Sequence, residues 1–376
     1  MGVKVICADH RDSAVAIASK YCAGVHKWNF DASPEEESAA FLVELGSKIG
    51  GKPVLLATGD QRTLLVDRFR ERLSQYYRIP QPRIGAIARL YSKRSLFELC
   101  RQCGVPTPET YFPVSAEQVA RYAASMRFPV VLKAIDPDRL MRRTGRRMAV
   151  ANTVPELLDL FAALDEPGFS NLALQEFIIG NATDRWVISA YFDAESECRF
   201  SLTGQKLRQV PVTGGVTTYG MCTPCEAMVA SISEVARAAG YHGMIDADYC
   251  FDSRDGQWKL LDVNPRAGAN FRLCVDRNGL DVVRSQYLEL TGQPIPEVRP
   301  DWGRRWVVED KDYFACRDMA KQGAGRGEAD WWRTLWQASE RGYFSGDDLR
   351  PGIRFSAELG KRAFRSLGRR LLGKRA

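Results

Sequence analysis

Three oxygen-bearing side chains around residues 248–264 have the spacing of a metal site. Asp262 and Asn264 stand two residues apart at the end of an apolar run that is typical of a β-strand. Residues two apart on a strand share a face, so a carboxylate and an amide oxygen lie side by side. Asp248, upstream, can lie opposite them on a paired strand. Such hard oxygen ligands suit Mg²⁺, which proteins commonly hold with one or two carboxylates and the phosphates of a nucleotide.

A β-hairpin would position these ligands. The apolar runs 249–251 and 258–261 flank a polar turn that contains Asp255-Gly256. The second run leads into Asn264-Pro265-Arg266, so Arg266 places a fixed cation where phosphoryl oxygens would gather. An ordinary surface hairpin with a polar exit is the alternative, and Asp-x-Asn alone would favour it. The paired strand, Asp248 and the Asn-Pro-Arg sequence together favour the metal site.

In these features the sequence resembles the ATP-grasp superfamily, whose last metal-binding strand commonly reads acidic, apolar, Asn, Pro, Arg. The resemblance covers about residues 50–290 and is strongest to the predicted carboxylate–amine ligases, which include D-aspartate ligases. Further support comes from Ser19-Lys20-Tyr21-Cys22, Lys206-Leu207-Arg208-Gln209 and Gly240-Tyr241-His242-Gly243. The resemblance implies an α/β fold built of α+β lobes, the ATP-grasp fold, preceded by an N-terminal parallel βαβ domain. It also implies ATP and Mg²⁺ as cofactors, with Mn²⁺ as an alternative metal.

Two lysines are candidates for binding the nucleotide phosphates. Lys133 lies in the apolar run 128–134, where burying a lysine without an anion costs several kcal/mol. Lys93 lies near the start of a helix expected over 92–103, where a cation is unfavourable unless an anion is nearby. The resemblance implies a phosphate contact for each, with Lys133 at the α- and β-phosphates. The alternatives are a solvated surface lysine for Lys93 and a strand lysine that snorkels to water for Lys133.

The apolar segment 172–179 matches the hinge between lid and main lobe in the superfamily. The resemblance implies that the Gln175 side chain meets the adenine amino group and that the backbone around Phe177 and Ile178 pairs with the ring edge. It implies Asp184 as a ligand of the ribose hydroxyls, with an exposed loop aspartate as the alternative. The implied nucleotide contacts of this region are Gln175, Glu176, Phe177, Ile178 and Asp184.

The segment 136–147 takes the place of the glycine-rich lid loop of the superfamily. It contains only Gly145 but five arginines, so guanidinium contacts could replace backbone contacts to phosphate, and a solvated mobile loop is the alternative. Further along, Arg208 is the candidate for binding the carboxylate or acyl phosphate of the substrate. Lys206 would share its strand face and is a weaker second candidate.

The chain divides into five predicted segments. Apolar runs at 3–8 and 53–57 flank a helical pattern at 34–48, and this βαβ pattern indicates a parallel sheet. Thr58-Gly59-Asp60, after the second run, would contact an acceptor substrate or merely cap a helix. The predicted segments are an N-terminal α/β domain (1–104), a small lid subdomain (105–180), a large subdomain with the metal site (181–297), a Trp-rich appendage that packs over the core (298–360) and a basic tail (361–376).

Charge is distributed unevenly along the 376 residues. The formal net charge of +7 equals the seven Lys and Arg of residues 361–376, which contain no acid, so the rest of the chain sums to zero. Nucleic-acid binding by the body of the protein is therefore not expected. In the tail, Phe364, Leu367 and Leu371 recur at helical spacing, a pattern typical of peripheral contact with an anionic membrane surface. A disordered solubilising tail is the alternative.

The sequence contains no run of eighteen apolar residues, so a membrane-spanning helix is not expected. Its start is typical of a β-strand rather than of a signal peptide. We therefore expect a cytoplasmic protein, with the tail as a candidate for peripheral contact at the inner membrane face.

These features together predict an ATP-dependent ligase that joins a carboxylate to an amine through an acyl phosphate, with an amino acid or its derivative among its small-molecule substrates. Such chemistry requires neutralised phosphates and reactants held in line rather than a protein nucleophile. Arg266 and Arg208 would stabilise the transferring group. A phosphotransferase on the same scaffold and a non-catalytic nucleotide-binding protein are the alternatives. The glycine-poor lid favours the latter, whereas Lys133, Asp262 and Asn264 argue against it.

Overall fold

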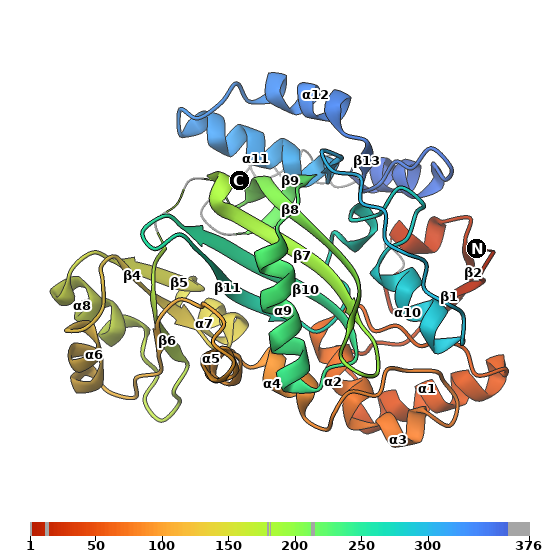
Figure 1. The fold of residues 1–376 in the computed structure, drawn as a ribbon, viewed down its shortest axis with the longest axis horizontal. Coiled ribbons are helices and arrows are strands. Elements are labelled where there is room, and N and C mark those ends of the chain that lie inside the picture. The colour runs from red at the N-terminus through yellow and green to blue at the C-terminus, as the bar shows by residue number, and fades with distance from the viewer. Residues whose placement is uncertain (1, 12–14, 179, 181, 212–214, 360–376) are drawn as a thin grey trace, which may run out of the picture.

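The computed structural model describes residues 2–11, 15–178, 180, 182–211 and 215–359, which form three β-sheets surrounded by helices (Figure 1). The largest sheet occupies the centre of the molecule. Its strands are, in spatial order, β11 (Gln257–Asn264), β10 (Gly243–Asp252), β7 (Arg185–Phe192), β8 (Cys198–Val210), β9 (Val216–Cys222), β12 (Arg305–Val307) and β13 (Glu340–Arg341). The four-stranded sheet has the order β3 (Thr110–Tyr111), β6 (Leu172–Glu176), β4 (Val130–Ala134) and β5 (Met148–Ala151).

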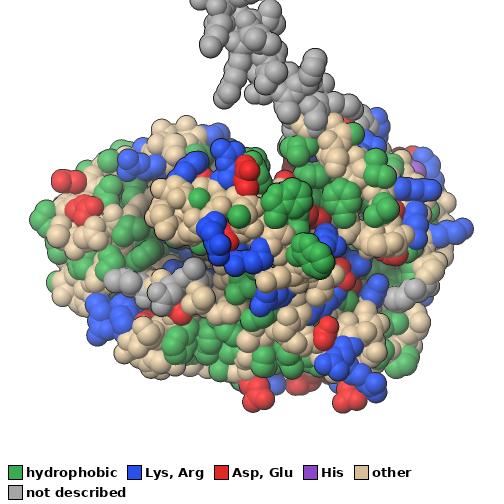
Figure 2. Space-filling view, turned by 90° about the horizontal axis from the view of Figure 1, so that it is seen from above, with side chains coloured by type: hydrophobic (Ala, Val, Ile, Leu, Met, Phe, Trp, Pro, Cys, Tyr) green, Lys and Arg blue, Asp and Glu red, His purple; other side chains and the backbone are tan. Residues whose placement is uncertain are grey.

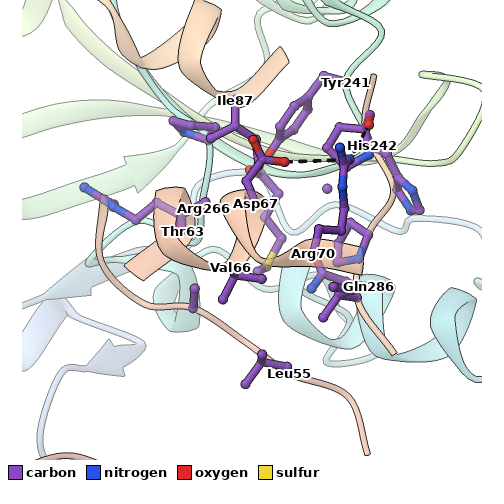
Figure 3. A pocket seen from close by; sticks show the side chains of 17 residues that line it. Leu55, Thr63, Val66, Asp67, Arg70, Ile87, Tyr241, His242, Arg266 and Gln286 are labelled. Carbon is purple, nitrogen blue, oxygen red and sulfur yellow. Dashed lines mark hydrogen bonds and ion pairs between the residues drawn. The ribbon is translucent and has the colours of Figure 1, made fainter. Parts of the chain in front are cut away.

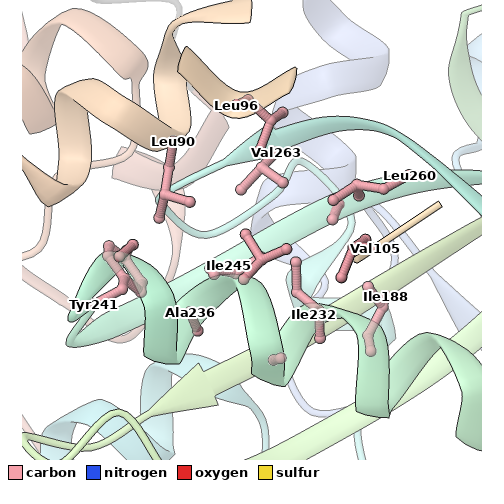
Figure 4. Close-up of a cluster of buried hydrophobic side chains, with 14 of the residues drawn as sticks. Leu90, Leu96, Val105, Ile188, Ile232, Ala236, Tyr241, Ile245, Leu260 and Val263 are labelled. Carbon is pink, nitrogen blue, oxygen red and sulfur yellow. The ribbon is translucent and has the colours of Figure 1, made fainter. Parts of the chain in front are cut away.

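Both faces of the large sheet are covered, so its interior strand β7 is buried along nearly its whole length. On one face, Ile188 of β7 packs against Ile232 of α9 (Glu226–Ala239). On the other face, Val187 belongs to a second core that includes Val282 of α10 (Val282–Leu290). Figure 4 shows the first of these cores, which also receives side chains from α4 (Ala86–Tyr91) and α5 (Lys93–Gln102).

The four-stranded sheet forms a separate layer at the side of the molecule (Figure 1). Its core contains apolar side chains of α6 (Ala116–Ala123) and α8 (Val154–Leu164). The N-terminus of α8 is capped by Thr153, whose side chain accepts a hydrogen bond from the Glu156 N–H. All four strands fall within residues 105–180, the predicted lid, although the division into domains stays a prediction.

The segment 136–147, expected as a loop, is mostly helical. Helix α7 (Pro137–Thr144) occupies it because its arginines are good helix formers and no glycine interrupts them. Gly145 ends the helix with a φ of 71°, a conformation that glycine adopts without strain. Arg139 is paired with Glu166, with 2.9 Å between Nε and Oε2.

The N-terminal region differs from the expected βαβ unit. Strand β1 (Val5–Ala8) pairs in parallel with β2 (Cys22–His26), and the helix expected over 34–48 is α1 (Glu35–Ile49). The strand expected over 53–57 is absent from this part of the described chain, where only an isolated bridge joins Val54 to Arg78. The apolar run therefore lacks a strand partner beside it, so no ladder forms. The helices α2 (Asp60–Arg68), α3 (Arg70–Leu73), α4 and α5 follow in the same region.

The Trp-rich appendage extends the large sheet. Strand β12 pairs with β9, and Trp306 of β12 is fully buried. The ring lies over Gly204 and Gly220, where a Cβ atom would come within 2.6 and 2.3 Å of it, so larger residues would displace the tryptophan. Helix α11 (Glu309–Lys321) packs on β8 and β9, and α12 (Glu328–Gln337) packs on α11. The appendage thus packs on the core as expected.

Candidate active site

The open end of the β10–β11 hairpin carries the predicted oxygen ligands. Asp248 of β10 lies directly opposite Asp262 of β11, which confirms the expected pairing. Asn264 lies opposite Asp246 in the same ladder. The alternation of side chains places these four polar residues on one face, since the intervening Ala247 and its partner Val263 belong to the core on the other face.

Asp246 is a member of this group that the sequence analysis missed. Burial, followed by the charge of Asp248, raises the pKa of its carboxyl to about 7, while Arg266 and Lys206 act in the opposite direction. Gly268 passes so close to Asp246 that a Cβ atom there would come within 2.2 Å of the carboxyl carbon. The spacing of two residues before Asp248 would have placed Asp246 on the same face.

The ligand set suits a divalent cation shared with phosphate oxygens. Within the described ranges, no three His, Cys, Asp or Glu side chains are arranged to hold a metal ion by themselves. Two facing carboxylates and an amide, in contrast, match the small protein contribution that Mg²⁺ takes beside a polyphosphate. Burial raises the pKa of Asp262, and the charge of Asp248 adds to this effect, so the site favours an added cation. The residues therefore fit Mg²⁺, and their role as ligands stays a prediction.

Lys93 and Lys133 converge on these carboxylates from two different elements. Lys93 is the first residue of α5, where Ser92 caps the helix by accepting a hydrogen bond from the Ser95 N–H. Its Nζ donates to the Ala134 carbonyl at 2.8 Å, next to Lys133 on β4. Burial and the charge of Lys133 lower the pKa of Lys93. Both lysines act in turn to lower the pKa of Asp262, so two cations face the predicted metal ligands.

Arg266 belongs to the same site and forms an ion pair with Asp60. Its Nη2 donates to Asn264 Oδ1 at 3.2 Å, and its Nε donates to Asp60 Oδ1 at 2.5 Å. Asp60 is the first residue of α2, in the Thr58-Gly59-Asp60 segment that the sequence analysis considered for the acceptor. The N-terminal region therefore contacts the site directly through this ion pair.

The structure separates the two basic residues proposed for the substrate. Lys206 Nζ lies 2.6 Å from Asp248 Oδ1 and is buried, so Lys206 belongs to the site. The guanidinium of Arg208 instead makes two 2.9 Å hydrogen bonds to Asp312 of α11 and stacks on Tyr219. A register irregularity between Lys206 and Arg208 accompanies this change of partners. Asp312 comes from the appendage, so the sequence analysis did not foresee this pair, and the substrate role of Arg208 stays a prediction.

The predicted adenine hinge is held by contacts within the protein. Gln175 Nε2 donates to Thr110 Oγ1 at 2.9 Å, and the Phe177 N–H donates to the Pro129 carbonyl at 3.2 Å. Ile178 is buried, and its carbonyl accepts a hydrogen bond from Arg185 at 3.3 Å. Asp184 ends a short 3₁₀ helix near β10. Burial raises the pKa of the Cys250 thiol, and the charge of Asp184 raises it further. Their nucleotide contacts stay predictions.

Glu176 has the most extensive set of partners in the hinge. Its carboxylate pairs with Arg254 at 2.6 Å and with Lys259 at 3.2 Å, two cations at the turn end of the β10–β11 hairpin. Both cations also contact Asp252, which is fully buried. This network of four charges, missed by the sequence analysis, ties the small sheet to the large one.

A small cavity lies between the N-terminal helices and the large sheet (Figure 3). Its volume is about 60 Å³, and most of its lining is apolar, with Leu55, Val66 and Ile87 among the side chains. Arg266 forms part of the wall, so the cavity adjoins the predicted phosphate site. His242 also lines it, and burial lowers the pKa of this histidine to about 4, which keeps the ring neutral at pH 7.

In the part of the chain that the structure describes, no helix combines the length and the apolar composition that a membrane crossing requires.

Comparison with known proteins gives one curated relative and many solved structures. A D-aspartate ligase of Enterococcus faecium is 28% identical over 243 residues, which span 62% of this chain and 57% of that protein. The match therefore covers less than two thirds of the relative. The chain matches no protein-family model.

The solved structures agree over most of the chain. The biotin carboxylase domain of 2-oxoglutarate carboxylase from Hydrogenobacter thermophilus, in complex with MgADP and bicarbonate, superposes with a TM-score of 0.61 at 16% identity, covering 81% of this chain and 68% of that one. Biotin carboxylase from Campylobacter jejuni gives 0.62 at 14%, with coverage of 81% and 69%. N5-carboxyaminoimidazole synthetase from Staphylococcus aureus gives 0.59 at 12%, with coverage of 80% and 74%. At these identities the likeness is one of fold.

Proposed function

We propose that this chain, which has the ATP-grasp fold of these solved neighbours, is an ATP-dependent ligase that joins a carboxylate to an amine. One observation carries the proposal: two lysines from separate elements act on the carboxylate of Asp262, which faces Asp248 across the ladder. Such an arrangement of cations and metal-binding oxygens suits a nucleotide triphosphate with its metal ion. The likeness to a D-aspartate ligase supports an amino acid as one substrate.

The reaction proceeds in two steps that need no protein nucleophile. A carboxylate oxygen of the first substrate bonds to the γ-phosphorus of ATP as the bond to the β-phosphate breaks, which gives an acyl phosphate and ADP. The amine nitrogen of the second substrate then bonds to the acyl carbon, phosphate leaves, and the nitrogen loses a proton. Each step requires charge neutralisation and in-line positioning of the reactants.

The chain supplies these requirements with a few side chains. Lys93 and Lys133 neutralise the phosphates, and Arg266 lies beside them to stabilise the transferring phosphoryl group. Asp248, Asp262 and Asn264 would hold Mg²⁺, or Mn²⁺ in its place, and the metal would add its charge to that of the lysines. Lys206, paired with Asp248, lies where it can contact the same oxygens. Arg208 would have to break its hydrogen bonds to Asp312 before it could bind the carboxylate or acyl phosphate of the substrate.

The proposal assigns the adenosine end of ATP to the hinge. Gln175 and the backbone at Phe177 and Ile178 would contact the adenine, and Asp184 the ribose. Glu176 lies in the same strand, and its ion pairs fix the position of the hinge relative to the large sheet.

Release of ADP from MgATP tests the function. We expect release only when a carboxylate and an amine are both present, and a screen of amino acids in pairs would find the substrates. Release with a single hydroxyl or phosphate acceptor would instead identify a phosphotransferase. Binding of ATP without any release in the full screen would identify a nucleotide-binding protein.

We further propose that the protein makes peripheral contact with an anionic membrane surface, at the inner face of the membrane. The basic tail of 361–376 lies outside the described residues, and its sequence supplies an electrostatic attraction. The appendage supplies an apolar attraction from a group of aromatic residues that we call the aromatic ridge. Ring contacts link four of them, Tyr313, Phe314, Trp331 and Trp332, and the fifth, Trp336, lies on the same helix as Trp331 and Trp332. Trp332 and Trp336, one helical turn apart on α12, are 63% and 90% exposed, and Figure 2 shows hydrophobic side chains on the face where α12 lies.

Peripheral binding that lasts commonly requires two such signals, and tryptophan favours the membrane interface. Co-sedimentation with phosphatidylglycerol-containing vesicles should therefore be salt-sensitive, and should weaken about tenfold or more both when 361–376 is deleted and when Trp332 and Trp336 become alanine. Vesicles of phosphatidylcholine alone serve as the control. Equal sedimentation of all variants would contradict the contact, and a Trp-dependent dimer in solution would assign the ridge to a second copy of the chain.

A further inference from the structure

The cavity of Figure 3 contains an ion pair, Asp67 and Arg70, whose facing atoms do not form a hydrogen bond. Arg70 Nη1 and Asp67 Oδ1 are 3.6 Å apart, beyond hydrogen-bond distance, although the two side chains are only 14% and 16% exposed. Asp67 Oδ1 is itself buried and has no hydrogen-bond partner among the described residues. Burial raises the pKa of this carboxyl, and Arg70 offsets that effect only in part. A buried carboxylate normally receives hydrogen bonds, so this one has unused capacity to accept them.

The surroundings explain why water or a charged ligand would be drawn to this pair. Leu55, Val66 and Ile87 supply an apolar wall, and His242 is neutral. The His242 ring is already engaged, since Nδ1 accepts a hydrogen bond from the Gln81 N–H at 2.9 Å. Asp67 and Arg70 are thus the two charges in the cavity besides Arg266 of the wall. Arg70 Nη1 also donates to the Pro82 carbonyl. A ligand that satisfies the pair therefore needs a cationic donor for Asp67 close to an anionic acceptor for the Arg70 guanidinium.

An α-amino acid has these groups at a matching distance. Standard bond lengths place its ammonium nitrogen and its carboxylate carbon about 2.5 Å apart, so one head group can contact both members of a pair separated by 3.6 Å. The cavity volume of about 60 Å³ admits roughly four to six water-sized atoms, and the head group of an amino acid has five non-hydrogen atoms.

We propose that this cavity binds the zwitterionic head group of an amino-acid substrate, with its ammonium on Asp67 and its carboxylate on Arg70. The role of the bound amino acid as a substrate rests on the proposed ligase function. Arg266 connects the cavity to the predicted metal and phosphate site. Arg266 lines the cavity and donates to Asn264, a predicted metal ligand. The remainder of the bound amino acid can therefore extend along Arg266 toward the phosphate site, with the head group fixed at the far end.

Direct binding tests the assignment separately from turnover. The L- and D-forms of the common amino acids are titrated into the full-length protein by calorimetry, with and without MgADP, and the strongest binder is compared with its des-amino analogue. We expect wild-type protein to prefer the amino acid by tenfold or more, because the analogue leaves Asp67 without its cationic partner. In Asp67→Asn this preference should fall to about twofold or less, while MgADP binding is unchanged.

Asp310→Asn is the matched control, because Asp310 Oδ1 is also a buried oxygen without a hydrogen-bond partner but lies on α11. It should keep the wild-type preference. The assignment is overturned if no amino acid binds, if Asp67→Asn keeps the preference, or if Asp310→Asn loses it equally. Binding that depends on Asp67 without any ADP release would keep the cavity assignment and reject the ligase function. ADP release that is insensitive to Asp67 would do the reverse.

Discussion

The two ends of the β10–β11 hairpin both carry carboxylates with nearby cations, but the pKa values of these carboxylates are shifted in opposite directions. At the turn end, Arg254 Nη2 and Lys259 Nζ each lie 2.6 Å from Asp252 Oδ2. Arg254 first and then Lys259 hold the pKa of the Asp252 carboxyl well below its usual range, against the effect of burial. At the open end, burial instead raises the pKa of Asp262, and raises that of Asp246 to about 7.

The difference distinguishes a structural ion network from a binding site. The turn end is neutralised by its own cations, so it fixes the hinge residue Glu176 and needs no ligand. At the open end, burial raises the pKa of Asp246 and Asp262 by more than the neighbouring cations lower it, and the pKa of Lys93 is lowered by burial and by Lys133. Like charges held in proximity favour ligands of opposite charge, and a metal ion with phosphates supplies both kinds.

Removing a carboxylate from the open end should give the largest effect on activity. In Asp262→Asn we expect ADP release to fall about a thousandfold, roughly 4 kcal/mol of transition-state stabilisation, because a metal ligand is lost. The free energy of unfolding should be unchanged or higher, because a buried charge with a raised pKa is removed. Turnover assays and urea denaturation measure the two quantities. Near-normal ADP release with Mg²⁺ would contradict the metal assignment.

Removing a cation from the turn end should reverse this pattern. Lys259→Met leaves Asp252 and Glu176 buried with Arg254 alone, so the free energy of unfolding should fall by about 3 kcal/mol. Turnover per folded molecule should change little. As a control, Lys48→Met removes an exposed ion pair with Glu44 and should cost less than about 1 kcal/mol. An equal loss of unfolding free energy in Lys259→Met and Lys48→Met would show that the network stabilises the protein no more than an exposed surface ion pair does.

The lysine at the open end should affect ligand binding rather than stability. Lys133→Met keeps most of the side-chain volume, so the strand should tolerate it. Affinity for ATP should fall about tenfold to a hundredfold, because charge-assisted contacts to phosphate are lost. Titration of ATP against wild-type protein and Lys48→Met measures the change. Wild-type affinity in Lys133→Met would mean that its amine merely snorkels to water.

Acid should weaken the turn end selectively, which is the smallest of these effects. A depressed pKa contributes stability above the unfolded value of about 3.9, and this contribution is lost as the pH falls below it. Asp252 has such a pKa, so the unfolding free energy of the wild type should fall more steeply between pH 5 and pH 3 than that of Asp252→Asn. Parallel curves would show that the carboxylate titrates normally. The raised pKa of Asp262 acts with the opposite sign, giving stability that is lost as the pH rises.

Local patterns predicted much of the fold and part of the site. The ATP-grasp fold was implied by the resemblance to that superfamily and agrees with the solved neighbours. The hairpin and the pairing of Asp248 with Asp262 follow from alternation and turn chemistry that act over a few residues. Helix α5 could be predicted for the same reason, with Ser92 at its start. The expected strand at 53–57 was wrong, because a strand needs a partner and that partner is not encoded in the apolar run itself.

The sequence by itself determined which side chains lie on a common face of a strand and where turns and helices begin. Only the tertiary structure decided their partners: Arg208 is held by Asp312, over a hundred residues later in the chain, and Glu176 by cations of a hairpin more than seventy residues away. The physical reason is that periodicity fixes the direction of a side chain through its own backbone. The charge that meets it depends instead on how distant segments pack, and that packing sets its burial and its pKa.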